Sequence, residues 1–297
     1  MTMRLLLLGL LWSVSIAGHA QMQTLATALN EQILMLRIGS GWGAVELETT
    51  LFKPNGDGPF PLAVINHGKA SGNPLFQARA RYLVAAEQFV ARGYMVVAPM
   101  RRGFSKSGGG YVHPGCNIHS NGMIQAEDIR DILAVMVKRT DVDAQRIVVV
   151  GQSHGGLSTM ALGSMNIPGV RGLINFAGGL RVEGGSSYCS WEKSMADAFE
   201  AYAAKTSLPS LWFYGDNDSY WGAELPKVLH QKYTGAGGKA KLISFGLFED
   251  GDAHAMFGRR SGLKIWLKPV EEFLRSVDMP FELLQRSVKL VPEADSK

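Results

Sequence analysis

Apolar runs and amphipathic segments alternate along most of the chain. Runs rich in β-branched residues are typical of strands in a parallel sheet, whereas apolar residues three or four positions apart indicate one face of a helix. Strands are therefore expected at 32–38, 45–52, 61–65, 94–98, 147–150, 173–176, 211–214 and 241–245. Helices are expected at 79–92, 125–138, 157–165 and 264–276. This alternation predicts an α/β fold, in which helices cover both faces of a mainly parallel central sheet.

The strand expected at 147–150 leads directly into Gly151-Gln152-Ser153-His154-Gly155, a G-x-S-x-G sequence. In this motif the glycines permit a tight, strained strand-to-helix turn that leaves the serine hydroxyl exposed at its tip. The β-branched run before the motif and the helical pattern after it supply the context that such a turn requires. We therefore predict that Ser153 is a catalytic nucleophile.

A serine hydroxyl is a poor nucleophile at neutral pH, so Ser153 needs a histidine base that is oriented by a carboxylate. The chain offers these groups in the order serine, acid, histidine, and His254 is the predicted base. Asp218 is the predicted acid, because it lies three residues after Gly215 and has room to turn back over the end of the strand. Asp216 is the alternative, but it lies in the turn itself, where Asp commonly caps the backbone.

The oxyanion that forms during acyl transfer is usually held by two main-chain N–H groups, one after the nucleophile and one after an earlier strand. The loop that follows the strand at 61–65 begins His67-Gly68-Lys69. The predicted donors are the main-chain N–H groups of Lys69 and His154, while Gly68 lets the loop approach and His67 supports it. The ring of His154 is excluded as the base, because it adjoins the nucleophile and points into the following helix. The alternative reading of His67-Gly68 is a simple strand-ending turn.

These motifs together resemble the α/β-hydrolase superfamily, most nearly its dienelactone hydrolase-like and prolyl oligopeptidase-related members. The resemblance spans about 29–276 and rests on Leu51-Phe52-Lys53-Pro54, Gly58-Pro59-Phe60-Pro61, His67-Gly68, Arg92-Gly93-Tyr94 to Arg102-Gly103, 143–156 and the loops of Gly215 and His254. It implies the α/β-hydrolase fold and serine hydrolase activity. The resemblance to dienelactone hydrolases implies a cysteine at the position of the nucleophile, whereas this chain has Ser153 at that position. This departure favours general ester hydrolysis.

Composition agrees with one enzyme-sized domain. A chain of 297 residues that is 46% hydrophobic can bury a large core, so residues 21–297 are expected to form a single domain. The formal net charge of +4 is small and scattered, which argues against a nucleic-acid partner. His113 and His119 flank Cys116 without a matching acidic residue, so we expect no metal and no other cofactor.

Residues 1–20 have the pattern of a secretory signal peptide. Arg4 supplies a positive charge, 5–12 is an apolar run, and Ala20 is a small residue suited to cleavage. The apolar run is too short to cross a bilayer, so no membrane span is expected in the mature chain. The protein is therefore predicted to be secreted or periplasmic.

Export changes the interpretation of the two cysteines. In an oxidising compartment Cys116 and Cys189 are expected to form a disulfide. Both follow the carboxyl ends of predicted strands, where α/β folds place their sites, so the bridge is expected to tie two loops together beside Ser153.

Three classes of function are compatible with these motifs. The first is a secreted serine hydrolase that cleaves a small-molecule carboxylic ester through an acyl-enzyme. The second is a small serine peptidase of the prolyl oligopeptidase type, although the chain has no room for the propeller domain of such enzymes. The third is an inactive hydrolase-fold binding protein, against which the intact serine, acid and histidine argue. We expect the first.

Overall fold

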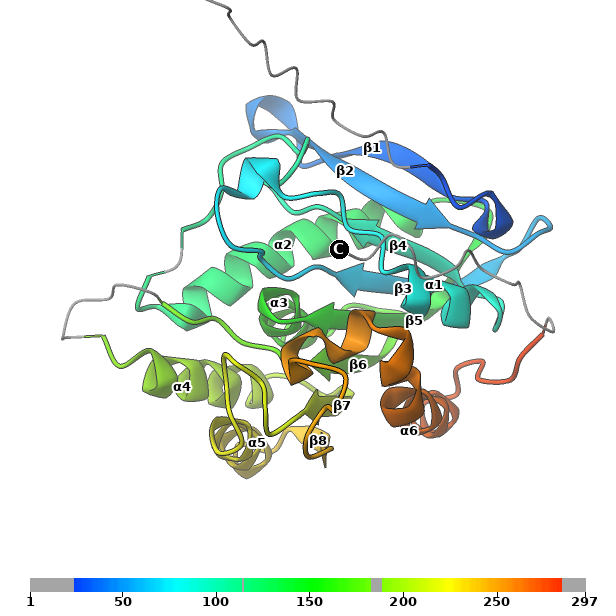
Figure 1. Cartoon of the computed structure of the whole chain (residues 1–297). Helices are drawn as coiled ribbons and strands as arrows, with labels where there is room; N and C mark the ends of the chain where they lie inside the picture. Colours follow the sequence, from blue (N-terminus) through cyan, green and yellow to red (C-terminus); the bar gives the residue numbers. More distant parts are fainter. Residues whose placement is uncertain (1–23, 114, 183–188, 285–297) are drawn as a thin grey trace, which may run out of the picture.

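The computed structural model describes residues 24–113, 115–182 and 189–284. An eight-stranded sheet runs through the molecule in the order β1-β2-β4-β3-β5-β6-β7-β8 (Figure 1). Its strands are β1 (Gln32–Ile38), β2 (Val45–Phe52), β3 (Phe60–Asn66), β4 (Met95–Pro99), β5 (Val142–Gln152), β6 (Val170–Phe176), β7 (Pro209–Tyr214) and β8 (Lys239–Ser244). Strand β2 is antiparallel to β1 and β4, and the strands from β4 to β8 are parallel. The predicted mainly parallel sheet is confirmed. The signal peptide expected at 1–20 lies outside the residues described.

Helices cover both faces of the sheet, as predicted. One face packs against α2 (Ile118–Met136), α3 (His154–Gly163), α4 (Trp191–Ala203) and α5 (Leu225–Gly235). The other face packs against α1 (Leu83–Val90) and α6 (Leu263–Ser276). Along β5 the side chains alternate between the two cores, with Val149 in the first and Val148 and Val150 in the second. Because both faces are covered, this central strand is apolar at consecutive positions rather than at alternate ones.

Helix α1 begins at Leu83, later than the expected start at 79. Tyr82, just before the helix, has φ +47°, a left-handed conformation that interrupts helical geometry. Upstream of it, Arg79 and Arg81 reach back to a carboxylate at Glu31. The tertiary contacts of this segment therefore override its helical pattern.

Helix α2 begins at Ile118, earlier than the expected start at 125. The side chain of Asn117 accepts a hydrogen bond from the main-chain N–H of Ser120 at 2.9 Å and so caps the helix. The first turns of this helix carry polar residues and a glycine, Gly122, which hide the helical pattern.

Helices α4 and α5 are absent from the expected elements. The buried residues Met195, Phe199 and Tyr202 have helical spacing, a signal that could have predicted α4. Helix α5 buries few side chains, among them Leu229 and Tyr233, so its periodic signal is weak.

The predicted disulfide between Cys116 and Cys189 is present, with Cα atoms 5.6 Å apart and a sequence separation of 73. The hydroxyl of Ser194, in the first turn of α4, donates to the carbonyl of Cys116 and accepts from the N–H of Ile118. The bridge therefore fastens the start of α2 to the start of α4.

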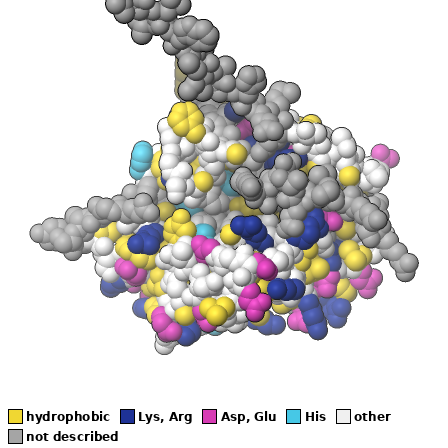
Figure 2. Space-filling view, viewed as in Figure 1, with side chains coloured by type: hydrophobic (Ala, Val, Ile, Leu, Met, Phe, Trp, Pro, Cys, Tyr) yellow, Lys and Arg dark blue, Asp and Glu magenta, His cyan; other side chains and the backbone are white. Residues whose placement is uncertain are grey.

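The surface carries charges of both signs. Basic and acidic side chains are interspersed over the lower half of the face shown in Figure 2. Within 24–113, 115–182 and 189–284, no helix has the length and apolar character needed to cross a membrane.

Candidate active site

Ser153 stands between β5 and α3 in a strained backbone conformation, with φ +55° and ψ −125°. Four main-chain hydrogen bonds hold it there. Its N–H donates to the carbonyl of Phe176 at 3.0 Å. Its carbonyl accepts from the N–H groups of Gly156, Leu157 and Gly179 at 2.8, 3.1 and 3.0 Å. This is the strand-to-helix turn that leaves a serine side chain exposed.

The glycines of the motif allow a very close approach of backbone to backbone. A Cβ at Gly151 would lie 2.1 Å from the carbonyl oxygen of Gly155. A Cβ at Gly155 would lie 2.0 Å from the carbonyl oxygen of Asn66, at the end of β3. Any side chain at either position would push α3 away from the sheet and shift Ser153.

The structure pairs His254 with Asp218. The two carboxylate oxygens of Asp218 lie 3.0 and 3.1 Å from Nδ1 of His254. The Asp218 side chain is fully buried, and it also accepts hydrogen bonds from the N–H groups of Tyr220 and Trp221. Asp216, the alternative acid, is exposed to solvent.

Asp252 links the loop that carries Asp218 to the loop that carries His254, a role that sequence reasoning missed. One oxygen of Asp252 accepts from the N–H of His254 at 2.9 Å and from that of Ser219 at 3.1 Å, and the other accepts from the Ser219 hydroxyl at 2.6 Å. Burial by itself raises the pKa of Asp252, but these hydrogen bonds outweigh it and bring the pKa below its ordinary value. Asn217 adds a second link by donating to the carbonyl of Gly251 at 2.9 Å. An aspartate two residues before the histidine is the one local signal of this arrangement.

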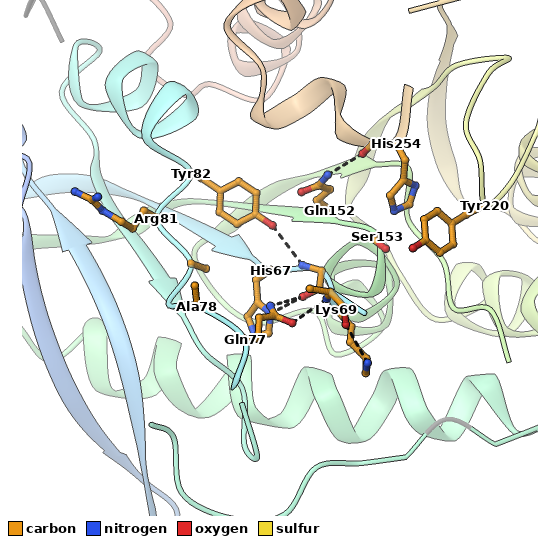
Figure 3. A pocket seen from close by; sticks show the side chains of 13 residues that line it. His67, Lys69, Gln77, Ala78, Arg81, Tyr82, Gln152, Ser153, Tyr220 and His254 are labelled. Atoms are coloured by element: carbon orange, nitrogen blue, oxygen red, sulfur yellow. Dashed lines mark hydrogen bonds between the residues drawn. The ribbon is translucent and has the colours of Figure 1, made fainter. Parts of the chain in front are cut away.

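Ser153 and His254 line a single pocket of about 370 Å³ (Figure 3). Gln152 and Tyr220 also line it. Gln152 donates its side-chain amide to the carbonyl of His254 at 2.8 Å, and the Tyr220 ring lies 4.4 Å from the His254 ring. The remaining lining residues are His67, Gly68, Lys69, Ala70, Gln77, Ala78, Ala80, Arg81 and Tyr82. Neither cysteine of the disulfide is among them, so the bridge joins two helix starts and does not form a wall of this pocket.

The loop after β3 lies against the serine. A Cβ at Gly68 would lie 3.1 Å from Cβ of Ser153 and 3.7 Å from its hydroxyl oxygen. In the part of the chain that the structure describes, the main-chain N–H groups of Lys69 and His154 donate to no other group. His154 is also the first residue of α3, so its N–H lies at the positive end of the helix dipole. Both N–H groups are free to bind an oxygen.

Two side chains from the segment before α1 hold this loop. Gln77 donates to the carbonyl of Gly68 at 3.0 Å and accepts from the N–H of Ala70 at 2.8 Å. The hydroxyl of Tyr82 accepts from the N–H of Gly68 at 3.3 Å. These partners, which line the same pocket, carry no motif that sequence reasoning could have used.

The other two histidines near the serine are buried and structural. Nε2 of His67 accepts from the N–H of Arg101 at 3.1 Å, and Nε2 of His154 contacts the side-chain oxygen of Asn121 at 2.8 Å. Burial lowers the pKa of both rings well below the usual range, and the charge of Arg101 lowers each further. Both are neutral at pH 7, which leaves His254 as the histidine of the pocket that is paired with a carboxylate.

The histidines near the disulfide pack against aromatic rings. His113 lies edge-on to Tyr111 at 4.9 Å, and His119 stacks on Tyr202 at 5.0 Å. No group of three or more His, Cys, Asp or Glu side chains that could hold a metal ion occurs among the residues with a described position.

Comparisons with known proteins agree with this architecture. Residues 64–232, more than half of the chain, match the family model of serine aminopeptidases, S33, and the match includes Ser153 and Asp218. Among curated proteins, none matches this sequence.

Solved structures share the fold at low sequence identity. Esterase Pf2001 of Pyrococcus furiosus is similar with a TM-score of 0.61 and 15% identity over 86% of this chain and 96% of its own. Est1E of Butyrivibrio proteoclasticus, with ferulic acid bound, has a TM-score of 0.58 and 18% identity over 82% of this chain and 99% of its own. The acylaminoacyl peptidase of Pyrococcus horikoshii has a TM-score of 0.59 and 17% identity over 87% of this chain but 43% of its own.

These similarities confirm the α/β-hydrolase fold that the sequence predicts. The chain belongs to the serine aminopeptidase S33 family of α/β-hydrolases.

Proposed function

We propose that the protein is a secreted serine hydrolase that cleaves carboxylic esters of small molecules through an acyl-enzyme. One observation carries the proposal: the histidine paired with Asp218 lines the same pocket as Ser153. The strained turn at Ser153 and the two free N–H groups beside it support the same chemistry.

The mechanism follows from which groups face one another. Asp218 accepts the Nδ1–H of His254, which leaves Nε2 as the basic nitrogen. Nε2 takes the proton of Ser153 as its oxygen attacks the acyl carbonyl, and the N–H groups of Lys69 and His154 bind the developing oxyanion. His254 then gives the proton to the departing alcohol. A water molecule, activated in turn by His254, attacks the acyl-enzyme and releases the acid.

A peptidase activity is the second candidate, favoured by the family match and by the likeness to an acylaminoacyl peptidase. An aminopeptidase must bind the free ammonium group of its substrate, for which a carboxylate is the natural partner. Lys69, which makes no ion pair with a described residue, lines the Ser153 pocket, whereas no Asp or Glu of the described chain does. Arg81 also lines the pocket, but its guanidinium is paired with Glu31. The charge of the pocket therefore favours an ester substrate over an aminopeptide. An inactive binding protein, the third candidate, has no need for the His254–Asp218 contact.

A fluorophosphonate probe tests whether the serine is reactive. The probe should label the wild-type protein and leave Ser153→Ala unlabelled, because the hydroxyl is the attacking group. Ester hydrolysis by the variant should fall by several orders of magnitude while its circular dichroism spectrum stays unchanged. Equal labelling of a folded Ser153→Ala variant would refute the assignment of the nucleophile.

A substrate panel separates the two activities. We expect short and long p-nitrophenyl esters to be hydrolysed with a much higher kcat/KM than the p-nitroanilides of amino acids. The same labelled serine would serve both reactions, so the ratio of the two values is the decisive measurement. A ratio in favour of the anilides would make the protein a peptidase.

Export is part of the proposal and has its own test. When the full sequence is expressed in a bacterial host, the protein recovered from the periplasm or medium should begin at Gln21. Cytoplasmic protein that still carries residues 1–20 would contradict the signal peptide.

A further inference from the structure

A second pocket of about 650 Å³ lies next to the Ser153 pocket, and Lys69 lines both. Its walls come from the loop after β3, including Leu75, and from the glycine-rich loop after β4, including Tyr111 and His113. In Figure 3 the side chain of Lys69 extends away from Ser153 and His254. A substrate whose carbonyl is held by the Lys69 N–H can therefore continue past this residue into the second pocket.

The walls of the second pocket are held in place by main-chain hydrogen bonds. The N–H of Ser105 donates to the carbonyl of Pro74 and joins the two loops, and the N–H of Gly103 donates to the carbonyl of Gly108, both at 3.1 Å. Gly103 has φ +76°, and a Cβ there would lie 2.2 Å from the nitrogen of Tyr111. The glycine-rich loop is closed on itself, so the pocket exists before any ligand binds.

One part of the pocket is aromatic and apolar. The ring of Tyr111 is held edge-on between Phe104 at 5.2 Å and His113 at 4.9 Å. Leu75 adds an aliphatic side chain that is 54% exposed. Such surfaces bind a planar ring or another compact apolar group.

The other part of the pocket is positively charged. The Lys69 ammonium donates to the carbonyls of Ala70 and Gly72, each at 3.0 Å, and lies 5.8 Å from the centre of the Tyr111 ring. Among the residues with described positions, Lys69 makes no ion pair, and neither pocket is lined by an Asp or Glu. The positive charge at the junction of the two pockets is therefore available to a ligand.

We propose that the second pocket is a substrate subsite, which binds the part of the ester remote from the scissile bond: an aromatic or compact apolar group that carries a carboxylate. The ring of this group contacts Tyr111 and Leu75, and its carboxylate pairs with the Lys69 ammonium. The proposal rests on the proposed ester hydrolysis and specifies its substrate class.

Matched ester pairs test the charge. One pair, 4-carboxyphenyl acetate and its methyl ester, carries the acidic group on the alcohol side. The other, p-nitrophenyl 4-carboxybenzoate and its methyl ester, carries it on the acyl side. For at least one pair, Lys69→Met should lower the acidic-to-neutral ratio of kcat/KM about fivefold, as expected for one partly exposed ion pair. Lys69→Arg should largely restore the ratio.

Substitutions at Leu75 place a charge of either sign in the second pocket, outside the Ser153 pocket. Leu75→Glu should lower the acidic-to-neutral ratio of kcat/KM, and Leu75→Lys should raise it. Val228→Glu, at a similarly exposed position on α5, changes the net charge equally and should leave the ratio unchanged.

Binding measurements keep this test independent of turnover. Calorimetry on Ser153→Ala protein should show tighter binding of the acidic ester than of its neutral partner, and the difference should disappear in the Ser153→Ala/Leu75→Glu double variant. Unchanged ratios in the Lys69 and Leu75 variants of an active, labelled enzyme would overturn the subsite and leave the hydrolase assignment standing. If the protein showed neither labelling nor turnover, the proposed function would fail. Equal binding of the acidic ester and its neutral partner to the Ser153→Ala protein would then overturn the subsite separately.

Discussion

At the residue scale, the site depends on a few side chains and backbone positions held under unusual conditions. A non-glycine residue with positive φ costs on the order of 1–3 kcal/mol, and the four main-chain hydrogen bonds of Ser153 offset that cost. Arg101 is fully buried, and burial lowers its pKa to about 10, so it remains charged at pH 7. Its guanidinium donates to the carbonyl of His67 at 2.7 Å and thereby anchors the loop beside the serine.

The two aspartates near the end of β7 provide a prediction at this scale. Asp218→Asn should lower kcat on the order of a thousandfold or more, because the amide no longer holds His254 in the tautomer that leaves Nε2 basic. Asp216→Asn should cost less than about fivefold, because that carboxylate is exposed and does not contact the histidine. Steady-state kinetics on both variants make the comparison, and the reverse ranking would assign the orienting role to Asp216.

At the scale of elements, the closeness of α3 to β3 sets the position of Ser153. Gly155→Ala should reduce stability by about 3 kcal/mol and displace the serine, because the new Cβ would meet the carbonyl oxygen of Asn66. Urea unfolding and the activity of the folded fraction measure the two effects. Gly235→Ala is the control, since a Cβ at the end of α5 meets nothing within 4 Å and the change should be neutral or slightly stabilising. Equal stability of the two variants would contradict the close approach.

A second prediction at this scale concerns Glu31, which joins the start of β1 to the segment before α1. Its buried carboxylate accepts from Arg79 at 3.0 Å, from Arg81 at 2.7 Å and from the N–H of Ala26 at 2.6 Å. Burial raises its pKa, but these hydrogen bonds outweigh burial and bring the pKa below the ordinary 4.5. Because the folded state has the lower pKa, the stabilisation is present above about pH 4.5 and is lost as the pH falls through the folded pKa.

Glu31→Gln should therefore lower the free energy of unfolding by about 3 kcal/mol at neutral pH, because two partly buried guanidinium groups lose their buried partner. Thermal unfolding should show a difference from the wild type that narrows as the pH falls below about 4.5. Glu46→Gln, at an exposed position on β2, should show no such difference. A gap that stayed constant with pH would mean that the charge of Glu31 is not the source of the effect.

At the scale of the whole molecule, the disulfide joins parts of the chain that are 73 residues apart. Closing a loop of this length lowers the entropy of the unfolded chain, and the chain-entropy model assigns it about 4 kcal/mol as an upper value. The double variant Cys116→Ser/Cys189→Ser should melt roughly 10 °C below the wild type. Kinetics on small acetate esters should stay within about twofold, since neither cysteine lines the Ser153 pocket.

The reduced wild-type protein offers an independent control, because its melting temperature should match that of the double variant. Mass spectrometry of exported protein should find the two cysteines bonded. Two free thiols in that protein would contradict both the bridge and the oxidising compartment.

Local signals in the sequence were enough to predict several features of the fold and of the candidate site. The turn at Ser153 could be located because a β-branched run, two glycines and a helix follow one another directly in the chain. Asp218 could be preferred over Asp216 from its distance to Gly215 alone, and the structure shows Asp218 beside His254. Alternating apolar runs predicted the mainly parallel sheet, because burial on both faces leaves a continuous apolar pattern.

The tertiary structure alone decided where distant segments meet. The hydrogen bonds between Asp252 and Ser219 join residues 33 positions apart, and Tyr82 reaches Gly68 across 14 positions, so no local pattern records either contact. The late start of α1 depends on partners at Glu31, and the second pocket exists only where two loops pack together. The sequence by itself determined the sheet, the tight turn at Ser153 and the order of the candidate groups, because these are encoded by short-range pattern. The support of the loops and the shape of the two pockets followed from packing, since they arise between segments that the pattern does not connect.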